Sequence, residues 1–559
     1  MCLHKTILDG LNTEQGSAVT APDGPVLIVA GPGTGKTLTI VRRIAYLVGQ
    51  GVNPENIAAV TFTNRAARQM QERTYVLLGE DASGAFIGTL HLLGLRILRD
   101  CLPAGFIVYG RNEQMSLLKR LIKGSRWKAE DLAERISRIK GLLENAGDEI
   151  NDIYSAYEHA LHESNALDFD DLIMKPVSLF GDTELLEKYR QRCRHIIVDE
   201  YQDINPAQYR LLKLLSGDSG NIFAVGDSDQ AIYAFRGADI ENFLNFDGDF
   251  RNTSRVELVN SYRSSGTIIG AAGSLISNNK KRMEKRVVPV KESDGLITVY
   301  TVPDERTEGE VIVDEIEARI GGTSHYRLMN INPGRVFSDN SYGFSDFAVL
   351  FRTNAQAKAL EEAFGESGIP FQVIGRRHTE KRKKALDALS RLRHGTGQDI
   401  TDDLLKEIAE ELRAIGISID CTLDSPSIAV NVLNELSLLT PEDDFDLRAD
   451  AVALMTLHMA KGLEFRVVFI AGTEDGLIPY TITKGAVDME EERRLFYVGM
   501  TRAKDELFLI HARKRFLYGR QLSPSPSQFL NEIPDRFLDR KSVFERQRNR
   551  KDSKQMKLF

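Results

Sequence analysis

The chain has 559 residues, 42% of them hydrophobic and 27% charged, which at about 150 residues per domain predicts three or four domains. It lacks a run of ~18 apolar residues, a secretory signal and any Cys-x-x-Cys pair, so we expect a cytoplasmic protein with no membrane partner and no zinc or disulfide framework. The net charge of −8 does not indicate a nucleic-acid binder, and local basic runs such as Lys280 to Arg286 are more often solvated helix faces.

Apolar runs typical of buried strands recur in the first half of the chain, with helical patterns between them. They lie at 26–30, 57–62, 195–198 and 222–225. This alternation predicts a parallel α/β sheet. Between residues 90 and 194 the pattern becomes helical, which predicts a helical insertion in that sheet.

A second α/β series follows, with strands expected at 296–302, 347–351, 452–457, 467–472 and 506–511. A long loop is expected at 321–343, and the basic composition after residue 535 favours a mobile tail. The predicted domains are a first motor domain (1–88 and 195–256), a helical insertion (89–194), a second motor domain (257–385 and 448–534), a reduced second insertion (386–447) and a basic mobile tail (535–559).

The first strand run ends in a glycine-rich turn where a helix can begin. In such a strand-loop-helix the backbone N–H groups and the helix N-terminus bind phosphates, Lys36 reaches the β- and γ-phosphates, and the Thr37 hydroxyl ligates Mg²⁺. The pattern therefore predicts binding of ATP or another nucleoside triphosphate, although Ala30 stands where glycine is usual. The predicted phosphate loop consists of Ala30, Gly31, Pro32, Gly33, Thr34, Gly35, Lys36 and Thr37.

An acidic pair, Asp199 and Glu200, directly follows the strand run at 195–198. Hydrolysis of a triphosphate needs a carboxylate that holds Mg²⁺ through water and another that orients or deprotonates the attacking water. We assign these tasks to Asp199 and Glu200 respectively. A lone Asp-Glu pair is usually a solvated turn, but one at the end of a buried strand after a phosphate loop favours the second nucleotide motif.

From residue 11 to about 534 the chain resembles the superfamily-one helicases of the UvrD/PcrA/Rep type, which move 3′ to 5′ on single-stranded DNA. The resemblance implies an α/β fold with two RecA-like parallel-sheet P-loop motor domains that carry helical insertions. The segments that carry it are Leu11–Gln15, Ala59–Ala67, Gly88–His91, Asn165–Leu172, Val225–Ala238, Ser261–Ser264, Met455–Phe465 and Glu491–Lys504.

The resemblance also implies roles for individual residues. At the nucleotide, Gln15 reads adenine, Tyr262 stacks on the base, Glu464 adds a contact, Gln230 senses the γ-phosphate, and Arg263 and Arg502 reach that phosphate. Stacking aromatics can grip DNA without reading its sequence. One of Phe62, Tyr233 and Phe235 is expected to be a core residue instead. The implied DNA contacts are Phe62, Thr63, Asn64, His91, Tyr233, Phe235, Thr456, His458 and, as a separation pin at the fork, Tyr518.

The chain departs from the family at Ser261 and in the length of its second insertion, and its last residues suggest an additional partner. Ser261 replaces an Asn of the family and is expected to affect local capping more than chemistry. The second insertion is reduced, which predicts weaker autoinhibition than in the long relatives. The final residues, Gln555 to Phe559, are similar to peptides that dock on sliding clamps, and a frayed tail that touches DNA is the alternative.

Three functions follow from these patterns. The first is an ATP-dependent helicase that unwinds DNA forks during repair or replication. The second is a translocase that moves on single-stranded DNA and displaces bound proteins with little unwinding. The third, a non-catalytic scaffold, is disfavoured because it has no use for Lys36, Glu200 and two γ-phosphate arginines together.

Overall fold

The computed structural model describes residues 7–103, 105–217, 220–292, 295–320, 342–375, 434, 437–438, 443, 445–446, 448–482 and 487–543. The chain folds into two compact units. Unit 1 comprises Met1–Tyr262, Arg282–Val288 and Ile374–Phe445, and unit 2 comprises Arg263–Lys281, Pro289–Val373 and Asp446–Phe559. Within the described ranges, no helix is long and apolar enough to cross a membrane.

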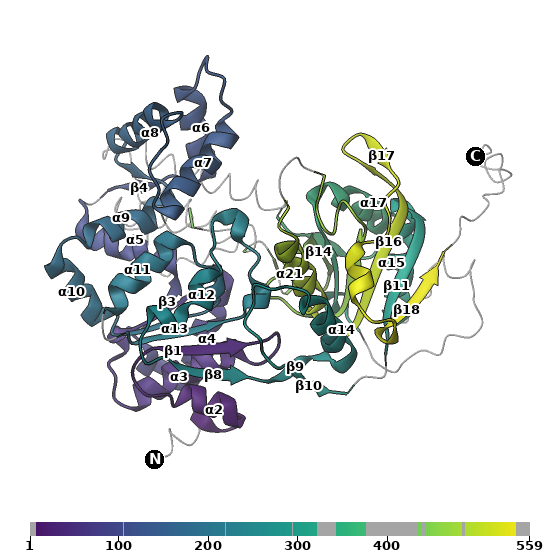
Figure 1. The fold of residues 1–559 in the computed structure, drawn as a ribbon, viewed down its shortest axis with the longest axis horizontal. Helices are drawn as coiled ribbons and strands as arrows, with labels where there is room; N and C mark the ends of the chain where they lie inside the picture. The colour runs from purple at the N-terminus through teal and green to yellow at the C-terminus, as the bar shows by residue number, and fades with distance from the viewer. Residues whose placement is uncertain are drawn as a thin grey trace, which may run out of the picture. The chain divides into compact units, whose positions relative to one another are not determined.

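Unit 1 is built on a parallel sheet of six strands in the order β3-β2-β6-β7-β1-β8 (Figure 1). The four strands expected from the sequence are confirmed, whereas β3 and β8 were not predicted, and the boundary expected at residue 256 falls inside β8. The strands are β1 (Val26–Ala30), β2 (Ile57–Thr61), β3 (Phe86–Thr89), β6 (His195–Val198), β7 (Ile222–Gly226) and β8 (Ser254–Leu258).

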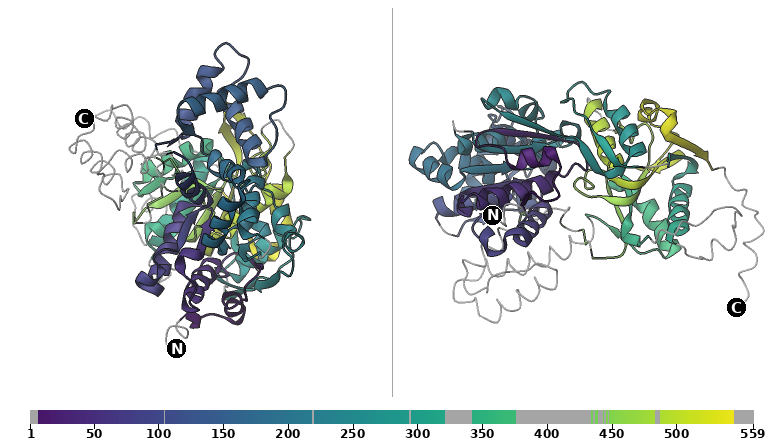
Figure 2. Two further views of the ribbon diagram at one scale, coloured as in Figure 1. Left: turned by 90° about the vertical axis from the view of Figure 1, so that its left-hand side faces the viewer. Right: turned by 90° about the horizontal axis from the view of Figure 1, so that it is seen from below.

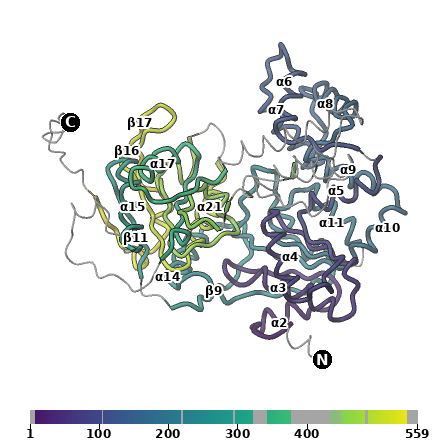
Figure 3. The backbone as a smooth tube through the Cα atoms, turned by 180° about the vertical axis from the view of Figure 1, so that it is seen from behind, coloured from purple at the N-terminus to yellow at the C-terminus, as the bar shows by residue number. Residues whose placement is uncertain are grey.

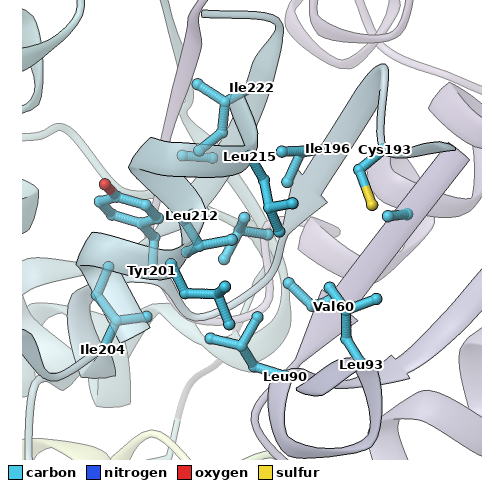
Figure 4. Packing of buried hydrophobic residues seen from close by; sticks show 14 of the residues in the cluster. Val60, Leu90, Leu93, Cys193, Ile196, Tyr201, Ile204, Leu212, Leu215 and Ile222 are labelled. Carbon is cyan, nitrogen blue, oxygen red and sulfur yellow. The ribbon is translucent and has the colours of Figure 1, made fainter. Parts of the chain in front are cut away.

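Alternate residues of β1 enter two different hydrophobic cores because successive side chains of a strand point to opposite faces. Leu27 and Val29 pack into one core and Val26 and Ile28 into the other, so the sheet is covered on both faces. Figure 4 shows the first core, where residues of β2, β6 and β7 meet the helices beside them. The main flanking helices are α2 (Thr13–Val19), α3 (Lys36–Gly49), α4 (Asn64–Leu78), α11 (Pro206–Ser216), α12 (Glu241–Leu244) and α13 (Phe246–Asp249).

The helical insertion predicted between β3 and β6 is confirmed, and its distal helices α6, α7 and α8 form one group (Figures 1 and 2). They share a small core of their own. Lys140 of α7 is buried in ion pairs with Asp168, Asp171 and Glu158. The insertion comprises α5 (Leu90–Cys101), β4 (Ile107–Val108), α6 (Arg111–Leu121), α7 (Ala129–Leu142), α8 (Asn151–Glu163), β5 (Ala166–Leu167), α9 (Asp171–Leu179) and α10 (Thr183–Arg192).

Unit 2 has a second parallel sheet in the order β13-β14-β12-β15-β16-β11-β18, with β17 pairing antiparallel to β16. The five strands expected from the sequence are confirmed; four of them have small shifts at their ends or none, and the one expected at 506–511 extends from 503 to 517. The strands are β11 (Ile297–Asp304), β12 (Phe347–Phe351), β13 (Phe371–Val373), β14 (Val452–Thr456), β15 (Phe465–Ala471), β16 (Ala503–Leu517), β17 (Arg520–Leu522) and β18 (Leu538–Ser542), and the helices are α14 (Gly266–Ile276), α15 (Glu305–Ile320), α17 (Ala357–Ser367) and α21 (Met489–Met500).

Strand β18 corrects the expectation of a mobile tail from residue 535. It pairs in parallel with β11, and the Val543 N–H donates to the Thr301 carbonyl, so the chain is ordered through residue 543. The remainder of the predicted tail and almost all of the predicted loop 321–343 lie outside the described residues. A two-stranded sheet of β9 (Asn260–Ser265) and β10 (Val288–Lys291) completes the fold.

Most of the predicted second insertion, 386–447, also lies outside the described residues. The few described positions that precede residue 446 belong to unit 1. The Asn434 amide donates to the Phe106 carbonyl and accepts from the Val108 N–H, and Leu438 joins the core beside α5. Asn434 and Leu438 therefore lie between strands of the second α/β series in the sequence but make their contacts with the first unit.

Candidate nucleotide and DNA sites

The predicted phosphate loop connects β1 to α3 and needs glycine at Gly35. Gly35 has φ 89°, a left-handed conformation that glycine adopts without strain, and a Cβ there would lie 2.6 Å from Gln15 Nε2. The same Gln15 amide donates to the Thr34 carbonyl at 3.0 Å. The Thr34 hydroxyl in turn donates to the Gly31 carbonyl at 2.9 Å. The loop is thus held in one conformation by its own atoms and by the predicted adenine reader.

Tyr262 lies beside this loop, on the side of the N-terminal motif. Its N–H donates to the Gly33 carbonyl, and its hydroxyl accepts from the Asn12 amide at 3.0 Å. Asn12 and Gln15 cap α2 through reciprocal hydrogen bonds. The Tyr262 side chain is 45% exposed, so the structure brings an open aromatic ring and Gln15 to the same edge of the loop.

Ser261 does more than cap a local turn. Its buried hydroxyl donates to the Pro32 carbonyl at 2.8 Å, which fastens β9 to the phosphate loop. Ser261 was expected to affect local capping more than chemistry, and the structure adds a contact with the phosphate loop that was not predicted. The reason is that the contact joins residues 229 positions apart, which local sequence patterns do not report.

Lys36 begins α3 and directs a buried ammonium toward the acidic pair. Its Nζ lies 3.4 Å from Glu200 Oε1 and has no hydrogen-bond partner among the described residues. A buried ammonium without hydrogen bonds is costly, so the site fits an anionic ligand such as a triphosphate. Thr37 and Asp199 add the hydroxyl and carboxylate oxygens that Mg²⁺ prefers.

Glu200 stands in a strained backbone conformation and begins a chain of hydrogen bonds. Its φ is 52°, which is uncommon for a residue other than glycine and typical of functional positions. Glu200 Oε2 accepts from the Gln202 amide, whose oxygen accepts from the Asp227 N–H at 3.0 Å. Asp227 Oδ2 accepts from Gln230 Nε2 at 2.6 Å. The predicted water-activating carboxylate and the predicted γ-phosphate sensor are thereby linked by direct contacts.

Two basic residues at this site were not predicted. Arg282 donates two hydrogen bonds to Asp229, and Lys285 bonds both Asp227 and Asp229. Although burial raises it, the pKa of Asp229 is lowered by the charges of Lys285 and Arg282. The expectation that the basic run 280–286 is a solvated helix face is wrong for these two side chains, because they neutralise buried carboxylates more than 50 residues away.

The three candidate aromatic DNA contacts of unit 1 differ in exposure. Phe62 and Tyr233 stack with their ring centroids 4.4 Å apart, and Tyr233 is 3% exposed while Phe235 is 64% exposed. The Arg236 guanidinium lies 5.2 Å and 5.6 Å from the Tyr233 and Phe235 ring centroids. Tyr233 is therefore buried as a core residue is, in line with the expectation of one core residue, and Phe235 is the most exposed of the three rings.

The other DNA candidates of unit 1 have partners within the protein. The Thr63 hydroxyl accepts from the Ala66 N–H and caps α4. The Asn64 amide donates to the Leu438 carbonyl and to Asp443 Oδ2, both at 2.9 Å. His91 packs on Phe169 with the ring centroids 4.0 Å apart. Burial and the nearby charge of Arg236 lower its pKa to about 3, so the imidazole is neutral at physiological pH.

In unit 2, Arg263 and Glu464 form an ion pair. Arg263 Nε lies 2.7 Å from Glu464 Oε2, and Lys504 Nζ lies 2.8 Å from Glu464 Oε1. Burial raises the pKa of Glu464, but the two cations lower it to about 2 overall. Thr456 ends β14 and His458 lies in the turn that follows.

Arg502 is 1% exposed and is packed inside unit 2. Its guanidinium donates to the Val498 and Leu463 carbonyls and to the Thr501 hydroxyl. These contacts belong to the α21–β16 junction and account for the packing of Arg502 without a ligand. The role of Arg502 at the γ-phosphate stays a prediction from the resemblance.

β17 pairs with the end of β16 to form a hairpin that projects from the sheet of unit 2 (Figure 3). Phe516 and Tyr518 are 62% and 55% exposed, and the Tyr518 hydroxyl lies 3.3 Å from the Tyr480 hydroxyl. Arg515, just before them, is buried and forms ion pairs with Glu308 and Glu474. The structure therefore presents Tyr518 on a hairpin with a buried, charged base.

The sequence resembles known families over most of its length. Residues 11–251 match the UvrD/REP helicase N-terminal domain, and residues 256–430 and 399–514 match the UvrD-like helicase C-terminal domain. A protein named ATP-dependent DNA helicase PcrA from Staphylococcus aureus (strain MRSA252) is 34% identical, over 97% of this chain and 88% of its own length. Its namesake from Staphylococcus epidermidis (strain ATCC 12228 / FDA PCI 1200) is 33% identical, over 95% of this chain and 87% of its own length.

Among solved structures, the C-terminal domain of a possible DNA helicase from a Lactobacillus aligns with a TM-score of 0.25 and 15% identity, covering 50% of this chain and 98% of that chain. A likeness of that degree carries no weight. The two family matches together span both α/β series and include the phosphate loop, the acidic pair and the motifs around Gln230, Arg263 and Arg502. The chain therefore belongs to the UvrD/Rep helicase family.

Proposed function

We propose that this chain, an ATP-dependent DNA helicase, moves 3′ to 5′ along single-stranded DNA and separates the strands of a fork. The observation that carries the proposal is the buried Lys36 ammonium, which lacks a hydrogen-bond partner among the described residues and lies 3.4 Å from Glu200. That pairing suits hydrolysis because it places a cation for the phosphates next to a carboxylate for the water.

The residues of unit 1 suggest how hydrolysis proceeds. Lys36 and the loop N–H groups would hold the phosphates, and Thr37 and Asp199 would hold Mg²⁺, which when bound would supply positive charge at the phosphates. Glu200 accepts a proton from the attacking water. Gln230, linked to Glu200 through Asp227 and Gln202, reports whether the γ-phosphate is present. Gln15 and Tyr262 hold the adenine.

Two arginines of unit 2 are proposed, from the resemblance, to act on the γ-phosphate during turnover. Arg263 and Arg502 would supply positive charge at the γ-phosphate, an effect that reaches about 10³- to 10⁵-fold in related phosphoryl transfers. Glu464 holds Arg263 in its present position and would have to release or redirect it. The DNA strand would contact Phe62, Thr63, Asn64, His91, Phe235, Thr456 and His458. Tyr233, which is buried, would support the Phe62 ring on which it stacks.

Direction is tested with partial duplexes that carry a single-stranded tail on either the 3′ or the 5′ side. We expect ATP-dependent unwinding of the duplex with the 3′ tail and little of the other. Unwinding from the 5′ tail would contradict the proposed direction. If neither duplex is unwound while streptavidin is displaced from a 3′ end, the protein acts as the translocase that the sequence left as the alternative.

A substitution at the hairpin tests strand separation. We expect Tyr518→Ala to reduce unwinding at least about fivefold, because a stacked ring contributes roughly 1–3 kcal/mol. Single-strand-stimulated ATP hydrolysis should stay within twofold, because Tyr518 is not among the residues predicted to contact the nucleotide. Both rates are measured on one forked substrate. Tyr518→Phe keeps the ring without the hydroxyl contact to Tyr480 and should unwind normally.

Tyr75 supplies the matched control, since it is 59% exposed on α4. Tyr75→Ala should leave both rates unchanged. An equal loss of unwinding and hydrolysis in Tyr518→Ala would indicate a folding defect and would remove the pin assignment.

Two further proposals rest on sequence. The peptide Gln555 to Phe559 is proposed to dock on a sliding clamp, and it lies outside the described residues. A cytoplasmic location is proposed because the DNA substrate is found there.

A further inference from the structure

We propose that Lys285 is a positioning residue for ATP hydrolysis, which acts by fixing the Asp227 carboxylate and through it Gln230. This inference rests on the proposed function and deepens it. Lys285 belongs to a short segment of unit 1, Arg282–Val288, that we call the strap. None of the motifs found in the sequence includes the strap.

The strap supplies the charge that two buried carboxylates require. Asp227 and Asp229 are 0% and 1% exposed, and the Lys285 side chain between them is 2% exposed. Lys285 Nζ bonds Asp227 Oδ1 at 2.5 Å and also contacts Asp229, while Arg282 holds Asp229 from the other side. Two buried anions thus face two cations, an arrangement in which removal of either cation leaves a buried charge unbalanced.

Asp227 is the branch point of the hydrogen-bond chain. Its Oδ1 contacts Lys285, its Oδ2 accepts from Gln230, and its N–H donates to Gln202, which in turn bonds Glu200. Both carboxylate oxygens and the backbone N–H of Asp227 are therefore held by hydrogen bonds. Lys285 is the positively charged residue that contacts the carboxylate. Moving or reorienting that carboxylate would displace the Gln230 amide directly.

The strap also packs on the phosphate loop itself. A Cβ at Gly31 would lie 2.7 Å from Val287 Cγ2, so the strap and the loop are in close contact. The Met283 N–H donates to the Ser228 hydroxyl, and the Val288 N–H donates to the Val259 carbonyl. The strap is thus docked on unit 1 along its length, and Lys285 holds a set position over the motif that contains Gln230.

A double-mutant cycle distinguishes positioning from general stability. ATP hydrolysis with single-stranded DNA is measured for the full chain and for Lys285→Met, Gln230→Ala and the double variant. We expect Lys285→Met to lower kcat by about 10- to 100-fold with the KM for ATP within threefold, since loss of a supporting contact typically has an effect of this size. In the double variant the rate should equal that of Gln230→Ala, because Lys285 acts through Gln230.

Lys291→Met is the matched control, because Lys291 also follows α14 and forms an ion pair, with Asp505, but is 41% exposed. It should hydrolyse ATP like the unchanged chain. If Lys285→Met does not fold, the cycle is repeated with Lys285→Met combined with Asp229→Asn, which removes one buried charge of each sign. A kcat for Lys285→Met equal to that of the control, or effects of Lys285→Met and Gln230→Ala that multiply in the double variant, would overturn the proposal. An unchanged chain without DNA-stimulated hydrolysis would overturn the proposed function as well.

Discussion

Glu200→Gln is expected to lower DNA-stimulated ATP hydrolysis by about 10²- to 10⁴-fold while ATP still binds, the range by which a positioned general base accelerates proton transfer. The amide cannot accept a proton from water, yet its oxygen can still accept the hydrogen bond that Gln202 donates to Glu200 Oε2. Lys36 loses its nearest anion in this variant, so phosphate affinity should stay equal or rise.

Steady-state hydrolysis and the binding of a fluorescent ATP analogue are measured on the same preparation. Glu187→Gln serves as control, because Glu187 forms an exposed surface ion pair with Arg190. Hydrolysis by Glu200→Gln within threefold of the unchanged chain would contradict the assignment of Glu200 as the residue that activates water.

Arg515→Met is expected to reduce the free energy of unfolding of unit 2 by roughly 3–5 kcal/mol at neutral pH, the usual effect of removing one partner of a buried ion pair. Arg515 is the shared cation of Glu308 and Glu474, and all three side chains are nearly inaccessible to solvent. Without Arg515 both carboxylates must remain buried with no counter-charge or take up protons.

This loss should depend on pH. The pKa of Glu308 is raised to about 7. Burial is the largest cause of the increase and the charge of Glu474 adds to it, while the charge of Arg515 opposes it. The folded state therefore keeps a proton that the unfolded state releases above its ordinary pKa of about 4.5, so the stability from this group is present below pH 4.5 and is lost as pH rises through 7. In Arg515→Met the lowering contribution is absent, so the deficit should shrink as pH falls from 8 to 5.

Urea unfolding across this pH range measures the effect, with Arg540→Met as control. Arg540 and Asp535 form an exposed pair, 48% and 89% exposed, whose removal should change stability by less than about 1 kcal/mol. A deficit in Arg515→Met that is equally small, or that does not change with pH, would show that the two glutamates find other partners.

The strands that carry the nucleotide motifs could be predicted because they are buried on both faces. Runs such as Val26–Ala30 and His195–Val198 are rich in apolar residues and continuously buried, and a glycine or acidic signal follows each one directly. The same reasoning placed Lys36 after the first strand run and Glu200 after a later one. In the structure β7 lies between these two strands, β1 and β6, and Lys36 Nζ is 3.4 Å from Glu200 Oε1. The local sequence pattern was sufficient to predict functional residues that directly follow, in the sequence, the strand that positions them.

Contacts between distant segments could not be predicted in this way. Lys285 and Arg282 look like surface residues in the sequence, since nothing nearby shows that they meet carboxylates more than 50 residues earlier. From its motif, Arg502 was expected to reach the γ-phosphate. In the structure its guanidinium donates hydrogen bonds to backbone carbonyls of its own unit. Backbone carbonyls leave no sequence signal, so the burial of an arginine among them is visible only in three dimensions.

Strand β18 was missed for a related reason and determines where the chain can be shortened. Its sequence, Leu538–Ser542, is mostly charged, which hides a strand but suits an edge, because charged side chains discourage pairing with other molecules. It covers β11, whose residues from Ile297 to Tyr300 are buried. A protein truncated after residue 534 would uncover this apolar strand and tend to aggregate edge to edge, whereas one that ends after Val543 would keep the edge protected.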